Sequence, residues 1–143
     1  MLEVERRAIR FSKDQWIVSL YGRGLSMGGW SDAEEKVYGA LAQIASKLLV
    51  QGIDVILDYG FWYKRERTAA MNLASSVGAA AIIHFLDTPE ALRRERILVR
   101  NKALDTDSVE ISIQEFDKQL DWFEKPSESE GLQVEVILDK HEI

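Results

Sequence analysis

The stretch Val55-Ile56-Leu57-Asp58-Tyr59-Gly60-Phe61-Trp62 decides the fold class of this chain. Three apolar residues run directly into a carboxylate, and a glycine and bulky aromatic residues follow. Such a run is typical of a parallel strand buried on both faces. Its polar end emerges at the edge where open α/β sheets bind ligands. Asp58 therefore either lines a ligand site or simply ends a strand with an Asx turn before Gly60, and the sequence leaves both interpretations open.

Strand-like and helix-like segments alternate along the rest of the chain. Further strands are predicted near 8–11, 81–86 and 134–138. Helices are predicted near 12–20, 31–51, 64–77, 89–101 and 112–123, three of them opened by capping boxes at Ser12–Gln15, Ser31–Glu34 and Ser112–Glu115. Gly52 and Gly78 are expected to end two helices.

This alternation predicts one α/β domain over residues 1–143. We expect a mainly parallel sheet of about four strands with helices on both faces. We also expect residues 55–58 and 81–86 to lie side by side in that single sheet.

The overall composition excludes several classes of protein. The 143 residues carry a net charge of -6 and no cysteine. An acidic chain lacks the basic surface that nucleic-acid phosphates require, and without cysteine it has neither disulfides nor thiolate metal sites. No apolar run approaches the roughly 18 residues that span a bilayer. We therefore expect a cytoplasmic protein with no nucleic-acid or membrane partner.

Asp14 is a second candidate for chemistry because it lies in the first turn after a strand. A carboxylate there could accept the proton of a substrate hydroxyl, which is the base role in phosphoryl transfer. The simpler explanation is that helix dipoles favour acidic residues at helix N-termini. In the phosphotransfer interpretation Asp58 would help to hold Mg²⁺.

Arg93, Arg96 and Arg100 form a candidate anion site on the predicted helix 89–101. At 100° per residue they fall within an arc of about 60° on one face. Three guanidinium groups on one face could clamp a phosphoryl group. The alternative is a solvated face with local salt bridges.

Arg65 and Arg67 follow the aromatic residues and open the next predicted helix. Cations at that position oppose the helix dipole, which slightly favours contact with an anion. Trp62 and its aromatic neighbours could line a substrate pocket or plug the end of the sheet.

Together these motifs resemble the AAA-type ATP-binding proteins. These are small P-loop kinase-like proteins related to zeta toxins and chloramphenicol phosphotransferases. The resemblance covers roughly residues 6 to 125 and rests on the segments Ile9–Trp16, Gln51–Trp62 with Arg65 and Arg67, His84–Pro89 and Arg93–Asn101. It implies Mg-ATP as cofactor and a small molecule with a hydroxyl group as substrate.

The resemblance also implies roles for individual residues. Asp14 matches the family's substrate-activating aspartate, and Asp58 matches the acidic strand end near Mg²⁺. The phosphate-closing lid region is matched by Arg93, Arg96, Arg100 and Asn101. Arg65 and Arg67 match a basic pair after the aromatic segment.

One part of the family pattern has no counterpart in this sequence. The chain contains no G-x-x-x-x-G-K-[ST] phosphate loop. The glycine-rich segment Gly22–Gly29 lacks the Lys-Ser/Thr ending and does not follow a strand. In the family, a first strand and the phosphate loop precede the helix that Met1–Arg7 would end. We therefore expect a kinase-like phosphotransferase domain that is inactive or incomplete as this chain. The alternative is a non-catalytic binding module that forms a homodimer to bury exposed strand edges.

Overall fold

The computed structural model describes residues 7–103, 109–131 and 133–138. Within these ranges the order of elements is β1 (Ile9–Ser12), α2 (Lys13–Tyr21), α3 (Met27–Val50), β2 (Val55–Asp58), α4 (Lys64–Ser76), β3 (Ile82–Asp87), α5 (Glu90–Lys102), α6 (Ile113–Trp122), the 3-10 turn η1 (Glu128–Glu130) and β4 (Gln133–Leu138). The α/β class and the parallel strands are confirmed.

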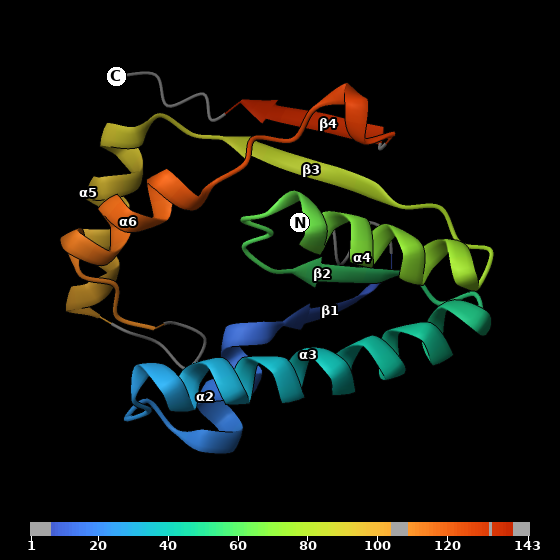
Figure 1. Cartoon of the computed structure of the whole chain (residues 1–143), viewed down its shortest axis with the longest axis horizontal. Coiled ribbons are helices and arrows are strands. Elements are labelled where there is room, and N and C mark those ends of the chain that lie inside the picture. The colour runs from blue at the N-terminus through green and yellow to red at the C-terminus, as the bar shows by residue number, and fades with distance from the viewer. Residues whose placement is uncertain (1–6, 104–108, 132, 139–143) are drawn as a thin grey trace.

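The four strands form two separate parallel pairs rather than one sheet. β1 pairs with β2, from Ile9 opposite Val55 to Ser12 opposite Asp58. β3 pairs with β4, from Ile82 opposite Gln133 to Asp87 opposite Leu138. The expectation that residues 55–58 and 81–86 share a sheet is wrong, because among the described strands β2 pairs with β1 and β3 pairs with β4. Figure 1 shows the four strands running in the same direction.

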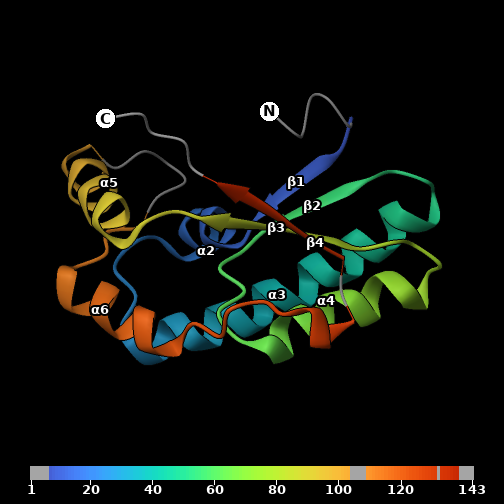
Figure 2. The same cartoon turned by 90° about the horizontal axis from the view of Figure 1, so that it is seen from above.

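The main core lies between the β1–β2 pair and the helices α2 and α3. Its buried members are Phe11, Ile17, Ala33, Val37, Leu41 and Ala45. The long helix α3 supplies four of them at helical spacing, so one apolar stripe covers one face of this pair. Figure 2 shows α3, α4 and α6 on the same side of the strands, with α5 lying beyond the carboxyl ends of the strands.

Helix ends follow local chemistry, with two differences from the prediction. The capping box at Ser112 and Glu115 is confirmed at the start of α6, and Gly52 and Gly78 have the positive φ angles, 75° and 73°, that suit glycine. Ser12 precedes α2 without a capping bond from its side chain.

The predicted box at Ser31–Glu34 is wrong because it lies inside α3. That helix begins at Met27, where the Ser26 hydroxyl accepts a hydrogen bond from the Gly29 N–H over 3.2 Å. Ser26 satisfies one of the free N–H groups of the first turn, so the helix begins within the segment predicted to be a loop.

Candidate functional site

The carboxyl ends of β1 and β2 bring the two candidate aspartates to one edge. Their parallel register places Ser12 opposite Asp58, and Asp14 follows two residues later in the first turn of α2. Asp58 and Arg100 of α5 both act electrostatically on the Asp14 carboxyl. Asp58 and Arg100 are therefore within electrostatic range of Asp14, although the three residues come from three different elements.

The surroundings of Asp14 raise its pKa above the ordinary value of 3.8. The largest cause is desolvation by the protein around the carboxyl, although part of the side chain stays open to solvent. Lys13 lowers the pKa, Glu34 and Asp58 raise it, and Arg100 lowers it. A carboxylate with a raised pKa holds a proton more readily, which suits a general base.

Asp58 is already engaged by a cation of the neighbouring strand. The Arg10 guanidinium donates to Asp58 Oδ2 from Nε over 2.9 Å, and its Nη2 makes a second contact with the same oxygen. A metal ion at Asp58 would have to displace this guanidinium. Beside this pair, Lys13 of α2 forms an ion pair with Glu34 of α3.

A Mg-ATP site at Asp58 would need ligands besides this carboxylate. Within the described ranges no three His, Cys, Asp or Glu side chains are grouped so as to hold a metal. Mg²⁺ in kinases is bound by one or two carboxylates together with the nucleotide phosphates. The sequence has no G-x-x-x-x-G-K-[ST] motif to hold those phosphates. Asp58 is therefore a single candidate Mg²⁺ ligand, and the other ligands of the ion are not identified.

The arginines of α5 do not converge on one point. Arg93 lies over the Phe116 ring of α6, with its guanidinium carbon 5.7 Å from the ring centroid. Arg94, which was not a predicted site residue, forms an ion pair with Asp117 at 2.5 Å and lies over the same ring. Arg96 is exposed on α5. Of the three predicted clamp residues, Arg100 is the one that acts on Asp14.

Asn101 fastens the segment before α6 to α5. Its Nδ2 donates to the Ile111 carbonyl over 2.7 Å, and its Oδ1 accepts the Ile111 N–H over 3.3 Å. Arg100 Nη2 donates to the Val109 carbonyl over 3.4 Å. These bonds connect α5 to the segment before α6, and they occupy two of the four predicted lid residues, Arg100 and Asn101.

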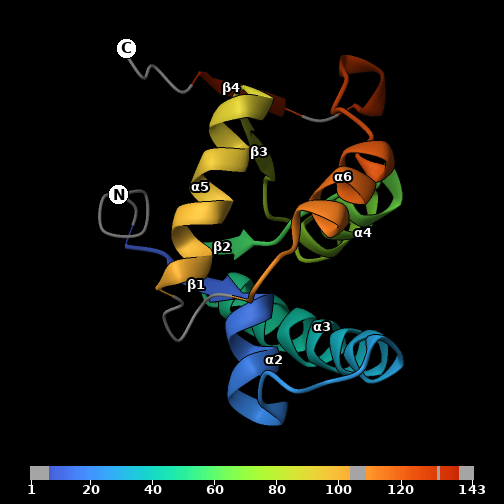
Figure 3. The ribbon, with the colours of Figure 1, turned by 90° about the vertical axis from the view of Figure 1, so that its left-hand side faces the viewer.

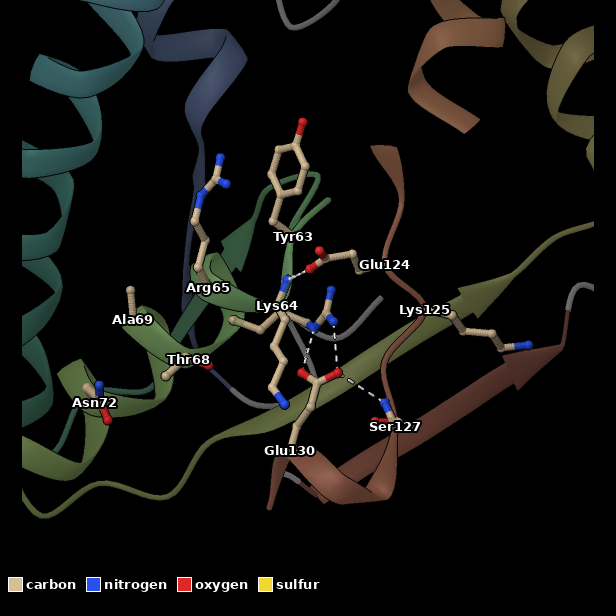
Figure 4. A pocket seen from close by; sticks show the side chains of 11 residues that line it. Tyr63, Lys64, Arg65, Thr68, Ala69, Asn72, Glu124, Lys125, Ser127 and Glu130 are labelled. Carbon is tan, nitrogen blue, oxygen red and sulfur yellow. Dashed lines mark hydrogen bonds and ion pairs between the residues drawn. The ribbon is translucent and has the colours of Figure 1, made fainter. Parts of the chain in front are cut away.

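A separate hollow lies at the N-terminus of α4 (Figure 4). Arg65 is exposed there and lies over the Tyr63 ring, 4.1 Å from its centroid. The backbone N–H of Lys64 is 2.5 Å from the Glu124 carboxylate that accepts its hydrogen bond. None of the residues lining this hollow is Asp14, Asp58 or Arg100, so it is distinct from the aspartate group.

Arg67 is a buried structural brace in this hollow. It is 2% exposed and donates two hydrogen bonds to Glu130, over 2.9 and 2.8 Å, and one to the Phe61 carbonyl over 3.0 Å. These guanidinium N–H groups donate to internal partners. Arg67 is therefore poorly placed to bind a phosphate. No local pattern pointed to Glu130 as the partner of Arg67, because Glu130 lies in a polar connector 63 residues away.

Trp62 packs inside the molecule rather than at the aspartate group. Its ring meets Phe123 edge-on with the centroids 6.1 Å apart, and Phe123 in turn stacks on Phe85 of β3. Of the two interpretations of Trp62, this contact favours the one in which it plugs the end of a sheet.

Comparison with known proteins identifies the family. A family model described as an AAA domain matches residues 2–126. No curated protein and no solved structure matches the chain significantly. The chain therefore belongs to the AAA domain family, which is a family of P-loop NTPase-like, kinase-like α/β domains. In the described part of the chain, no helix is long and apolar enough to cross a membrane.

Proposed function

We propose that this chain is the acceptor-binding part of a P-loop kinase-like phosphotransferase domain, related to zeta toxins and chloramphenicol phosphotransferases. Its substrate would be a small molecule with a hydroxyl group, and Mg-ATP would supply the phosphoryl group. The observation that carries the proposal is the grouping of Asp14, Asp58 and Arg100 at the carboxyl end of the β1–β2 pair.

Asp14 is the proposed base. Its carboxylate would accept the proton of the substrate hydroxyl, and the raised pKa makes that transfer more favourable than for an ordinary aspartate. Arg100 contributes positive charge near the same carboxyl, where negative charge would gather during transfer. Asp58, held by Arg10, would place a second carboxylate near Asp14.

These 143 residues would not turn over ATP by themselves. Without the backbone amides and the lysine of a phosphate loop, nothing in the sequence holds the β- and γ-phosphates. Phosphotransfer would require that loop from polypeptide outside residues 1–143.

Calorimetry with Mg-ATP tests the proposal. The 143-residue chain is expected to give no heat of binding at millimolar nucleotide. A chimera that carries the first strand and phosphate loop of another AAA-domain protein is expected to bind Mg-ATP. Asp14→Asn in the chimera should retain binding and lose phosphotransfer by about 100-fold or more, whereas Asp32→Asn, an exposed acidic control in α3, should retain both. Absence of binding by the chimera, or ATP turnover by the 143-residue chain, would refute it.

A second candidate function is a non-catalytic module that dimerises. The observation that favours it is the pair of unpaired strand edges on β2 and β3. It predicts a stable dimer in sedimentation equilibrium and no response to Mg-ATP in either the native chain or the chimera.

A further inference from the structure

The segment 123–130, called the strap below, lies between α6 and β4 in the chain and contacts two parts of the molecule. Figures 1 and 3 show β3 and β4 at one end of the molecule and α2 and α3 at the other, with α4 between them. The strap binds β3 on one side and the start of α4 on the other. It is therefore able to hold these two parts together.

Polar groups of the strap bind the start of α4. The Glu124 N–H donates to the Trp62 carbonyl over 2.8 Å, and the Glu124 carboxylate accepts the Lys64 N–H over 2.5 Å. About one helical turn later, the Glu130 carboxylate accepts two hydrogen bonds from the Arg67 guanidinium. Figure 4 shows Glu124 and Glu130 reaching from the strap to this helix. The two carboxylates thus satisfy a free N–H of the first helical turn and a buried cation.

Aromatic and charged side chains of the strap bind β3. The Phe123 ring stacks on the Phe85 ring of β3 with the centroids 5.8 Å apart, and it meets the Trp62 ring edge-on at 6.1 Å. The Lys125 ammonium donates to Asp87 Oδ2 over 3.2 Å and lies 5.2 Å from the centroid of the Phe85 ring. Phe123 therefore lies between a ring that follows β2 and a ring on β3.

The apolar core lies on one side of the strap. We call residues 7–76 the first half and residues 82–138 the second half. The main core and the side chains packed against it all come from residues 11–73, within the first half. In the described part of the second half, Phe116 is the one buried apolar residue. A part of a protein with few buried apolar contacts opens at a lower free-energy cost than a part that contains the core.

We propose that the strap is a clasp, and that the second half swings away from the first half as a unit when the contacts between the strap and α4 break. The core of the first half stays folded in this open form. The consequence for Asp14 rests on the proposed function. Arg100 lies on α5 in the second half and Asp14 lies on α2 in the first half. Opening would therefore remove the Arg100 charge from the Asp14 carboxyl, and the closed clasp keeps it there.

Contacts inside the second half allow it to move as a unit. β3 and β4 are paired along their whole length. The Arg94–Asp117 ion pair and the hydrogen bonds between Asn101 and Ile111 join α5 to α6 and to the segment before it. Residues 77–81, Val-Gly-Ala-Ala-Ala, join the two halves in the chain, and Gly78 has a φ angle of 73°. Small residues of this kind often absorb the backbone rotation of a hinge.

The Arg67–Glu130 pair is suited to a contact that opens and closes. Its side chains are 1% and 2% exposed in the closed form. When a buried ion pair opens, water solvates both charges, and this hydration offsets much of the attraction that is lost. Removing one partner has a different effect, because it penalises the closed form alone. Substitution of Arg67 should therefore shift the equilibrium towards the open form.

Native-state hydrogen exchange tests the inference on the 143-residue chain. Arg67→Met should speed exchange at the amides of β3, α5 and α6 by about 100-fold, and by the same factor on each because they open together. Arg65→Met is the control on the exposed face of α4 and should change these rates by less than about twofold. Ile17→Val shortens a fully buried core side chain. It should speed exchange in α3 by about fivefold and leave β3, α5 and α6 unchanged, because the core stays folded when the clasp opens.

Three results would overturn the inference. The first is faster exchange in both halves by the same factor in Ile17→Val, because the chain would then open as one unit. The second is equal exchange of β3, α5 and α6 in Arg67→Met and Arg65→Met. If Arg67→Met does not fold, Glu124→Gln replaces it and should speed exchange by about fivefold; unchanged rates there would count equally against the clasp. The third is faster exchange in α6 alone, which would show that α5 and Arg100 do not move with the strap. Failure of the ATP test would leave these outcomes unchanged, because no nucleotide is present.

Discussion

The Arg67–Glu130 pair gives the sharpest prediction about how the chain is held together. Its side chains are 1% and 2% exposed, and Arg67 also donates to the Phe61 carbonyl. Arg67→Met keeps much of the volume but removes the guanidinium partner of the Phe61 carbonyl and of the buried Glu130 carboxylate, to which the Ser127 N–H still donates over 3.1 Å. Removing one member of a buried pair typically costs 3–5 kcal/mol. Since Glu130 as a whole residue is only partly buried and keeps the Ser127 N–H bond, we expect the lower end, about 3 kcal/mol, or a Tm lower by roughly 10 °C.

Urea denaturation followed by tryptophan fluorescence measures this cost at pH 7. Arg65→Met is the matched control, because Arg65 is exposed on the same helix and should contribute less than about 1 kcal/mol through the Tyr63 ring. The double variant R67M/E130L should recover most of the loss, since apolar pairs often replace buried ion pairs at little cost. If Arg67→Met costs no more than Arg65→Met, then Arg67 is not a brace and its predicted phosphate-binding role returns.

The pH dependence of the same pair has a definite sign. Hydrogen bonds from Arg67 are the main cause that lowers the Glu130 pKa below 4.5. A depressed carboxyl pKa stabilises the folded state above the unfolded-state value. The stabilisation by Glu130 is therefore complete above a pH of about 4.5 and is lost as the pH falls through the depressed pKa. The difference in unfolding free energy between the native chain and R67M/E130L should show this loss between pH 7 and pH 3.

Three further predictions concern other parts of the chain. Asp14→Asn should raise the unfolding free energy at pH 7 by up to about 1 kcal/mol, because the pKa of the Asp14 carboxyl is raised in the folded state. The gain should vanish below the ordinary pKa of 3.8. A lower unfolding free energy at pH 7 would contradict this prediction. Gly60→Ala should destabilise the fold by about 1–3 kcal/mol, since the new methyl would lie 2.9 Å from Cδ1 and Cε2 of Trp62. Gly39→Ala is the control, because Gly39 is an exposed residue of α3 with open space around it, and it should stabilise the fold by about 0.5–1 kcal/mol. Equal effects of the two variants in thermal melts would exclude the steric argument. Ser112→Ala should cost about 1 kcal/mol by removing the capping box of α6, whereas Ser112→Thr should retain most of it; equal losses in urea denaturation would show that the hydroxyl is unimportant.

Much of the fold could be predicted because its causes are local. The apolar run at Val55 predicted β2, and the capping box at Ser112 predicted the start of α6. The meeting of Asp14 and Asp58 also followed from the sequence, because parallel strands direct their carboxyl ends to one edge. The start of α3 was misplaced because Ser31–Glu34 carries the capping-box pattern, whereas the helix begins earlier, where the Ser26 hydroxyl accepts the Gly29 N–H.

The sequence by itself determined which segments are strands and helices, since propensity, capping and periodicity act over a few residues. Only the tertiary structure decided the partners. It turned Arg67 inward to Glu130, directed Arg93 to Phe116, and split the strands into two pairs. Those outcomes depend on side chains far apart in the chain and on which backbone groups find a hydrogen-bonding partner. No local pattern encodes that competition, and among the described strands its outcome is two pairs in place of one sheet.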